Sequence, residues 1–422
     1  MIARKGRIPP SVVSGVVTVM YAAGLFAAAQ AEVAPPYSAL LEQTADAPRL
    51  VVSSAEVRRA EGLLDQADAR PNPSVSILAE NVAGSSPYTG FERAETTLQY
   101  SQPIELGGKR SARVAAGQAG VTAARARDHD ARVNYAFDLA RAYAAAEVAD
   151  RRVALAEDEV EAAQADLRVA RALVTAGKES RLRSLQAETA LDAVTADLAL
   201  ARAGRIAALA RLSALAGVEE PYTGLAESVL ERSFNQAVMG PFDPLTSSTY
   251  LVAVAERDAA DQRLMVERRR AVPDITVTVG LRRLNYEGVT AVMGGVTVPL
   301  HIFDRNRGNI TASSAEAEAA GAQLAMARND ARAEAQAAAA QFDAAGTRVT
   351  AAEAAIATAE ETYRLARIAY EAGKSPLVEL LAARRGLGAA RSVLLDARAA
   401  RFEARARLAR LHGLNIFGDP IQ

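Results

Sequence analysis

Residues 167–178 read LRVARALVTAGK, and residues 363–374 read YRLARIAYEAGK. The two stretches share Arg-x-x-Arg followed by Ala-Gly-Lys, and they lie 196 positions apart. The same offset relates Pro103 to Pro299, and no gap is needed between these points. A repeat of this length is far too long for a solenoid unit, so the sequence predicts a chain built from two duplicated halves.

Each half carries a heptad pattern that is typical of coiled-coil helices. One row of the pattern is alanine throughout, which lets neighbouring helix backbones approach closely. This row is Ala142, Ala149, Ala156, Ala163 and Ala170, and its copy is Ala338, Ala345, Ala352, Ala359 and Ala366. The segment from about residue 108 to residue 175 has no proline, and as a helix it would be roughly 100 Å long. A globular core cannot cover such a length, so the helices must lie in a bundle, a fibre or a tube.

Composition and the N-terminus indicate an exported protein. Arg4, Lys5 and Arg7 precede an apolar run that ends in Ala-Gln-Ala at residues 29–31, which predicts a cleaved signal peptide. No later segment has the roughly 20 apolar residues of a membrane helix, so any membrane crossing would have to use strands. The net charge is −1, which does not favour nucleic-acid binding, and the absence of cysteine excludes disulfides and a cysteine-linked lipid anchor.

Four short segments alternate apolar and polar residues with the period of a β-strand. They are residues 72–80, 95–102, 274–282 and 292–298, and the third places Val277 near its middle. Such segments suit either half-buried soluble hairpins or the strands of a membrane barrel, and the pattern alone leaves both open. Four strands cannot close a barrel, and their edges would need partners. Three copies would combine twelve strands and twelve helices in one tube.

Two strand-to-helix junctions carry a resemblance to a known family. Residues 101–110 read SQPIELGGKR, and residues 298–308 read VPLHIFDRNRG. Together with the Ala-Gly-Lys tips they resemble the TolC-like outer-membrane efflux factors, particularly the heavy-metal cation (CzcC-like) branch. The likeness covers about residues 40–415. His301 departs from the family pattern, and the first tip, with Glu179 and Arg181, keeps that pattern less well than the second.

The resemblance implies a mainly α fold with a small β part. Duplicated coiled-coil hairpins would form a periplasmic α-barrel, and four strands per chain would contribute to a trimeric 12-stranded β-barrel in the outer membrane. It further implies a homotrimer that contacts outer-membrane lipid, a periplasmic adapter and an inner-membrane pump of the RND type. The chain itself would be a passive duct that exports heavy-metal cations in a Gram-negative cell, and no cofactor is expected.

Two groups of residues are candidate functional positions. Near the hairpin turns, glycine can take a positive φ and end each helix, and the resemblance adds a role in adapter docking. Basic residues before the turns would suit the helix dipole and could also contact the adapter. The tip residues are Arg168, Arg171, Gly177, Lys178, Arg364, Arg367, Gly373 and Lys374. The junction residues are Pro103, Gly108, Lys109, Arg110, Pro299, Asp304, Arg305, Asn306, Arg307 and Gly308.

The charges at these junctions need a separate explanation. Cations at the start of a helix oppose its dipole, so something else must favour them. A basic girdle near the membrane and a solvated charged turn are the two interpretations. Arg205 and Arg401 interrupt the apolar row at matched positions, which usually fixes the register or faces a partner carboxylate.

The remaining residue types do not indicate catalysis or a metal centre. The three histidines, His129, His301 and His412, are far apart in sequence and have no cysteine partner. No nucleophile or phosphate-binding motif is present, so an enzyme is not expected. A soluble periplasmic coiled-coil adapter or structural protein is the alternative function. The predicted division is a signal peptide at 1–31, a first repeat at 32–217, a linker at 218–243, a second repeat at 244–413 and a tail at 414–422.

Overall fold

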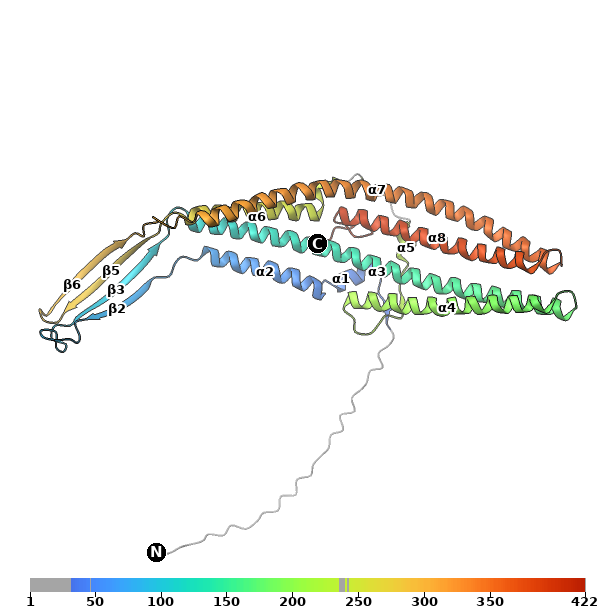
Figure 1. Ribbon diagram of the computed structural model, residues 1–422, viewed down its shortest axis with the longest axis horizontal. Helices are drawn as coiled ribbons and strands as arrows, with labels where there is room; N and C mark the ends of the chain where they lie inside the picture. Colours follow the sequence, from blue (N-terminus) through green and yellow to red (C-terminus); the bar gives the residue numbers. More distant parts are fainter. Residues whose placement is uncertain (1–31, 46, 235–239, 241–242, 422) are drawn as a thin grey trace, which may run out of the picture.

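The computed structural model describes residues 32–45, 47–234, 240 and 243–421. The predicted signal peptide therefore lies outside the described residues, as does part of the predicted linker. The described chain is elongated. A small sheet lies at one end, and the turns of two helical hairpins lie at the other (Figure 1). The fold is mainly helical with a small β part, as the sequence predicts.

The elements follow the duplicated order that the repeat indicates. They are β1 (Val33–Ala34), α1 (Tyr37–Gln43), α2 (Pro48–Asp68), β2 (Ser74–Glu80), β3 (Glu95–Ile104), α3 (Lys109–Thr175), α4 (Arg181–Ala216), β4 (Gly224–Leu225), α5 (Val229–Phe234), a 3₁₀ turn (Pro244–Thr246), α6 (Ser248–Arg270), β5 (Ile275–Leu284), β6 (Val289–Thr297), α7 (Arg307–Glu371) and α8 (Leu377–Leu411). Each half thus reads helix, two strands, long helix, return helix.

Two long helices, α3 and α7, run along most of the helical part of the molecule. α3 has 67 residues and α7 has 65, so each is roughly 100 Å long. Two shorter helices follow one another along each of them: α2 and α4 along α3, and α6 and α8 along α7 (Figure 1). α6 also packs against α3, and this contact joins the two halves near the sheet.

The heptad rows lie where the helices meet. Every residue of the two alanine rows is buried or half-buried, with Ala163 and Ala170 in α3 and Ala338 in α7 almost fully covered. The seam predicted from the sequence is therefore confirmed. α3 has different partners along its length, because α2 and α6 pack against its first half, and α4 and α8 against its second half.

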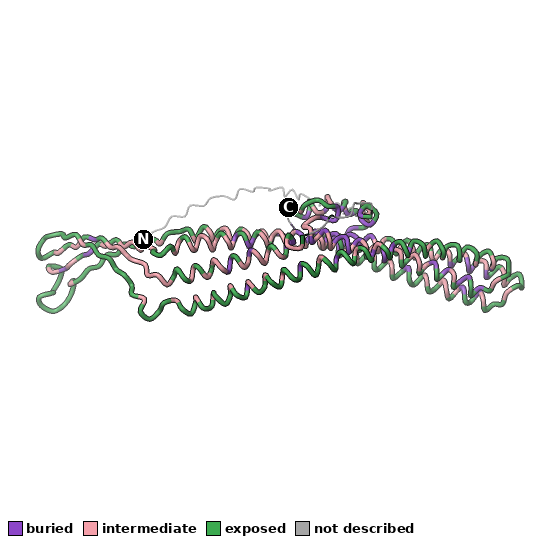
Figure 2. Tube along the Cα trace, turned by 90° about the horizontal axis from the view of Figure 1, so that it is seen from above, coloured by how far each residue is buried: buried purple, intermediate pink, exposed green. Residues whose placement is uncertain are grey.

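The main core lies near the middle of the molecule rather than at either end (Figure 2). Tyr37 of α1 and Tyr143 of α3 are fully buried there, and the Tyr37 hydroxyl donates to the Ala136 carbonyl oxygen at 3.0 Å. Phe417 of the C-terminal segment meets Tyr37 edge to face with ring centroids 5.7 Å apart. Segments from both ends of the described chain thus close this core.

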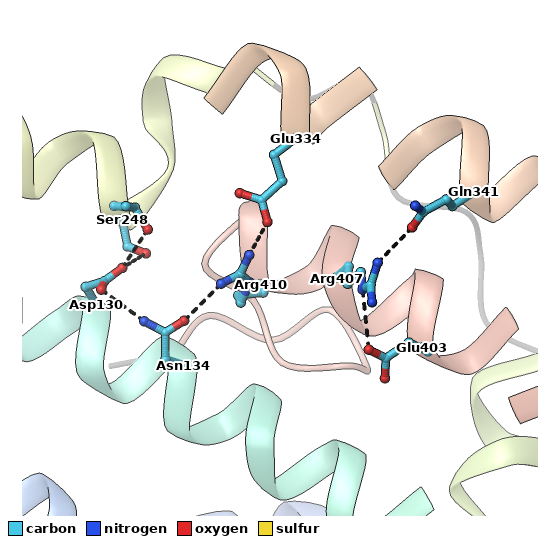
Figure 3. Close-up of polar contacts among 9 residues, drawn as sticks. Asp130, Asn134, Ser248, Glu334, Gln341, Glu403, Arg407 and Arg410 are labelled. Atoms are coloured by element: carbon cyan, nitrogen blue, oxygen red, sulfur yellow. Dashed lines mark hydrogen bonds and ion pairs between the residues drawn. The ribbon is translucent and has the colours of Figure 1, made fainter. Parts of the chain in front are cut away.

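Close to this core, a polar network ties α3, α6, α7 and α8 together (Figure 3). Asp130 of α3 accepts a hydrogen bond from the Ser248 hydroxyl at 2.7 Å, at the start of α6. Arg410 of α8 donates to the Asn134 side-chain oxygen at 3.2 Å and pairs with Glu334 of α7. The network links side chains from both halves, so it fixes how the second half sits on the first.

The four longer strands form one antiparallel sheet in the order β2-β3-β5-β6. Its register places Ile77, Leu98, Leu281 and Val292 opposite one another in one row. The other face carries polar residues such as Gln99 and Thr278. The predicted alternation is confirmed, although β5 extends to Leu284 and β6 begins at Val289. Val277 is therefore close to one end of β5, and Val279 is nearer its middle.

The sheet has two edges within the described residues, β2 and β6. Both have long rows of exposed side chains, and Ile77 and Val292 are 73% and 77% exposed. Unpaired edges of this length are ready to bond to another strand. Among the helices that the structure describes, none combines the length and apolar character that a membrane crossing requires.

Candidate functional surfaces: hairpin tips and strand–helix junctions

The two hairpin turns have the same backbone geometry. Gly177 and Gly373 have φ of +70° and +71°, a conformation that glycine adopts without steric cost. In the first turn, the Gly177 amide donates to the Val174 carbonyl oxygen at 3.0 Å and the Lys178 amide to that of Leu173 at 2.9 Å. The second turn repeats both bonds. This pair of bonds is the Schellman motif, so glycine ends both helices as predicted.

The structure brings the two tips to the same end of the molecule (Figure 1). Just behind them, Tyr370 and Leu377 of the second hairpin pack in one cluster with Leu167 and Ala170 of the first. Gly177, Lys178, Gly373 and Lys374 are all exposed beyond this cluster. The tips therefore form one joint surface, which is suited to contact another protein, although its docking role stays a prediction.

The arginines before the turns do not act on the helix dipole. α3 ends at Thr175 and α7 at Glu371, and neither helix has a basic residue in its last turn. The sequence-based interpretation of Arg168, Arg171, Arg364 and Arg367 as dipole partners is therefore wrong, because the effect of the dipole is confined to the last turn.

Three of these arginines, Arg171, Arg364 and Arg367, instead contact carboxylates on the helix surface. Arg171 pairs with Glu188 of α4 at 2.8 Å. Arg364 pairs with Glu361 at 2.7 Å, and Arg367 with Glu371 at 2.9 Å. Because all these side chains are largely exposed, solvent screens the pairs, and they remain accessible to a partner. A role in adapter contact stays a prediction.

The basic residues of the first junction have carboxylate partners within the same chain. Lys109, the first residue of α3, contacts Asp274 at 2.8 Å just before β5. Arg110 contacts Asp68 at the end of α2, at 2.7 Å. Carboxylates from two other segments therefore offset the unfavourable position of these cations at a helix start. Gly108 precedes α3 with a φ of +72° and sets the direction of the helix.

The second junction differs in detail from its copy. Pro103 is the penultimate residue of β3, whereas Pro299 lies beyond the end of β6 at Thr297. Asn306 takes the position before α7 with a φ of +58°, and its side chain donates to the Glu267 carbonyl oxygen at 2.8 Å. The backbone amide of Asn306 donates to a side-chain oxygen of Asp304 at 2.9 Å. Arg305, Arg307 and Gly308 are exposed.

The matched arginines of the return helices have different surroundings. Arg205 pairs with Asp150 and donates to the Thr223 carbonyl oxygen at 2.5 Å, so the predicted partner carboxylate is confirmed. Arg401 instead lies over the Phe234 ring, 4.1 Å from its centroid. The reason is in the repeat: Gly346 occupies the position in α7 that Asp150 occupies in α3. A partner carboxylate was one of the interpretations of both arginines, beside fixing the register or lining the lumen. Arg205 has such a partner, and the carboxylate at the matching position of α7 is absent for Arg401.

An ion pair that the sequence reasoning missed holds the two hairpins together near their tips. Arg384 of α8 donates to Asp166 of α3 at 3.2 Å, and their side chains are only 7% and 4% exposed. Burial raises the pKa of Asp166, while the charge of Arg384 acts in the opposite direction. Both residues flank the apolar rows, at the positions where coiled coils place charged pairs between helices. The position of the two residues beside the apolar heptad rows is the feature of the sequence that could have indicated this ion pair.

Removing one member of this pair is expected to destabilise the hairpins more than removing both. Asp166→Leu or Arg384→Met alone should cost about 3–5 kcal/mol, because each leaves one buried charge without its partner. The double replacement should cost less than the larger single one. Urea unfolding followed by circular dichroism of the detergent-solubilised protein would measure this. Simply additive costs would show that the two charges are independent.

The histidines do not converge with other ligands in the described part of the chain. No group of three or more His, Asp or Glu side chains placed to hold a metal ion is found there. His301 contacts the Ala271 carbonyl oxygen at 3.0 Å, at the end of α6. His301 thus has a structural contact at the junction.

Comparisons with known proteins agree with this architecture. The family described as "Outer membrane efflux protein" matches residues 40–218 and 248–414. The nickel-cobalt-cadmium resistance protein NccC of Alcaligenes xylosoxydans xylosoxydans is 42% identical over 408 residues, which cover 96% of this chain and 92% of NccC. The nickel and cobalt resistance protein CnrC of Cupriavidus metallidurans is 42% identical over 294 residues, 69% of each chain.

A solved structure shows the same fold at low sequence identity. A crystal structure of CusC superposes with a TM-score of 0.77 and 18% identity, over 90% of this chain and 92% of that chain. The family match covers both halves, including both long hairpins and the strand–helix junctions. The chain therefore belongs to the outer membrane efflux protein family, which makes it a transport channel of the outer membrane and not an enzyme.

Proposed function

We propose that this chain is the outer-membrane duct of a tripartite efflux system that exports transition-metal cations such as nickel, cobalt or cadmium. In this proposal three copies form the duct, with their strands in the membrane and their helices in the periplasm. The joint tip surface docks to a periplasmic adapter, and an inner-membrane pump of the RND type supplies the energy.

The observation that carries the metal assignment is the high identity to NccC along almost the whole of both chains. NccC is named for resistance to nickel, cobalt and cadmium. CnrC, named for nickel and cobalt resistance, is equally similar over a shorter stretch. A passive duct needs no dedicated metal site, so selectivity for the cation would belong to the pump.

The open sheet supports assembly from several copies. Single-chain membrane barrels begin at about eight strands, and the four-stranded sheet here leaves β2 and β6 as edges. In a ring of three copies, β6 of one would pair with β2 of the next, and no edge would remain. The apolar face, with Ile77, Leu98 and Val292, would then face lipid, and the polar face would line the lumen.

The detergent-solubilised protein is accordingly expected to be a trimer. Light scattering combined with size-exclusion chromatography should give three times the mass of the mature chain, after correction for bound detergent. A stable monomer with full helical content would contradict the proposed ring, since a single sheet would then be stable with both edges open.

A genetic experiment tests the transport function. Deleting the gene should lower tolerance to nickel, cobalt or cadmium and raise the cell content of that metal, and the intact gene should restore both. The matched control is a strain in which only the inner-membrane pump is inactivated, which should show the same sensitivity. Unchanged tolerance to all three metals in the deletion strain, with the pump strain sensitive, would contradict the proposal.

A further inference from the structure

An exposed apolar surface continues from the sheet past the end of β6. The apolar face of β6 includes Val292 and Val296. Leu300 and Ile302 follow after the strand has ended at Thr297, in a tight turn where the Ile302 backbone amide donates to the Leu300 carbonyl oxygen at 2.9 Å. Leu300 is 76% exposed and Phe303 is 98% exposed. Large apolar groups this open to solvent usually mark a contact with a partner or a membrane.

The first junction has the same pattern at matched positions. Ile104 and Leu106 correspond to Leu300 and Ile302 when the offset between the halves is applied. Both are also exposed on the single chain, although less than their copies. We call these four residues together with Phe303 the junction collar. Its four aliphatic members occur at matched positions in both halves, whereas Gly107 stands in the first half where Phe303 stands in the second. The matched pairs indicate a shared environment rather than one irregular loop.

The residues between the collar positions contact the helices and hold the two segments against them. Glu105 accepts a hydrogen bond from Arg113 of α3 at 3.0 Å. His301 contacts the Ala271 carbonyl oxygen at the end of α6. These polar residues contact the protein, whereas the collar side chains next to them are exposed.

Charges follow the collar directly. In the first junction, Lys109 and Arg110 pair with carboxylates of the same chain. In the second junction, Arg305 and Arg307 are exposed, and within the described residues neither forms an ion pair. An apolar surface bordered by available guanidinium groups matches the boundary of a lipid leaflet, where acyl chains give way to phosphate groups.

We propose that the junction collar is immersed in the periplasmic leaflet of the outer membrane, with Arg305 and Arg307 at its lipid phosphates. This inference rests on the proposed lipid-facing side of the sheet and extends the membrane contact beyond the strands. The collar would fix the depth of the duct in the membrane.

Tryptophan fluorescence can test the collar, because the chain has no native tryptophan. Phe303→Trp would be reconstituted in vesicles containing brominated phospholipids, which quench only a tryptophan that touches lipid. We expect blue-shifted emission, with stronger quenching by bromine near the head group than by bromine deep in the chain. Ile206→Trp, at an exposed position on α4, is the matched control and should not be quenched.

Val292→Trp separates failure of the collar from failure of the proposed membrane face. If Val292→Trp is quenched and Phe303→Trp is not, the strands face lipid and the collar proposal is wrong. If neither is quenched, the lipid-facing assignment of the sheet fails as well. Blue-shifted but unquenched emission from Phe303→Trp would show that a second copy of the chain covers it, which also overturns the proposal.

The head-group contact has its own test. Brominated phosphatidylglycerol should quench Phe303→Trp more than brominated phosphatidylcholine at the same mole fraction, because its net negative charge attracts the two arginines. The difference should disappear when Arg305→Gln and Arg307→Gln are added. Arg110→Gln, whose guanidinium is paired with Asp68, is the control and should keep the preference. Equal quenching by the two lipids in the parent protein would rule out the arginine contact.

Discussion

Gly373→Asp is expected to abolish export while leaving the trimer and its yield in the outer membrane nearly normal. The replacement places a charged side chain on the joint tip surface, where a β-carbon meets no other atom within 4 Å. The strain of a positive φ should therefore cost only about 1 kcal/mol, which a long hairpin tolerates. The loss would be functional, because the adapter could no longer dock. Metal tolerance and heat-stable trimer on a gel would measure the two effects.

Gly217→Asp is the matched control for backbone strain. Gly217 ends α4 with a φ of +73°, far from the tips, and it also has room for a β-carbon. It should therefore export normally. Gly177→Asp should have a smaller effect than Gly373→Asp, because the first tip keeps the family pattern less well. Normal export by Gly373→Asp would contradict docking at the tips, and equal loss in Gly217→Asp would assign the effect to strain.

Crosslinking gives an independent measurement of the same contact. The chain has no cysteine, so Lys374→Cys provides a single reactive thiol on the exposed second tip. In cells it should crosslink to the adapter. Ser85→Cys, in the loop between β2 and β3 at the opposite end of the molecule, should not. A lack of crosslinking at Lys374→Cys would weigh against tip docking even if the duct itself is functional.

Val279→Arg should reduce assembled protein much more than Thr278→Arg. Val279 lies near the middle of β5 on the apolar face, and it is 55% exposed on the single chain. An arginine there would face lipid and should cost about 2–4 kcal/mol near the centre of the bilayer. Thr278 lies on the opposite, polar face, where an arginine would reach into the lumen.

The measurement is the amount of trimer in purified outer membranes, with total expression as the reference. The pair is closely matched, because the two residues are neighbours on the same strand and receive the same side chain. Equal loss from both replacements, or a greater loss from Thr278→Arg, would show that the apolar face of the sheet does not contact lipid.

The local periodicity of the sequence predicted much of the fold. The alanine rows predicted which faces of α3 and α7 are covered, and the strand alternation predicted the apolar face that contains Ile77 and Leu281. Glycine at the tips predicted both helix ends. These features depend on residues a few positions apart, and the geometry of a helix or strand relates such residues directly.

The sequence predicted where the candidate sites lie, but it did not predict which groups their basic residues contact. The tip arginines were attributed to the helix dipole, yet Arg171 contacts Glu188 on the neighbouring helix. At the first junction Lys109 and Arg110 pair with Asp274 and Asp68, which neither the girdle nor the solvated-turn interpretation predicts. In these three pairs the partner lies on another element, and the sequence distance between the two groups does not indicate that they meet. Arg364 and Arg367 differ, because their partners Glu361 and Glu371 lie on the same helix.

The sequence by itself therefore determined the duplication, the long hairpins, the seam and the two faces of the strands. Only the tertiary structure decided how the halves meet: the insertion of α6 between α3 and α7, the burial of Phe417 beside Tyr37, and the pairing of Asp166 with Arg384. The physical reason is that periodicity specifies which face of an element is covered. Which other element covers that face depends on packing and charge pairing between segments that are far apart in the chain.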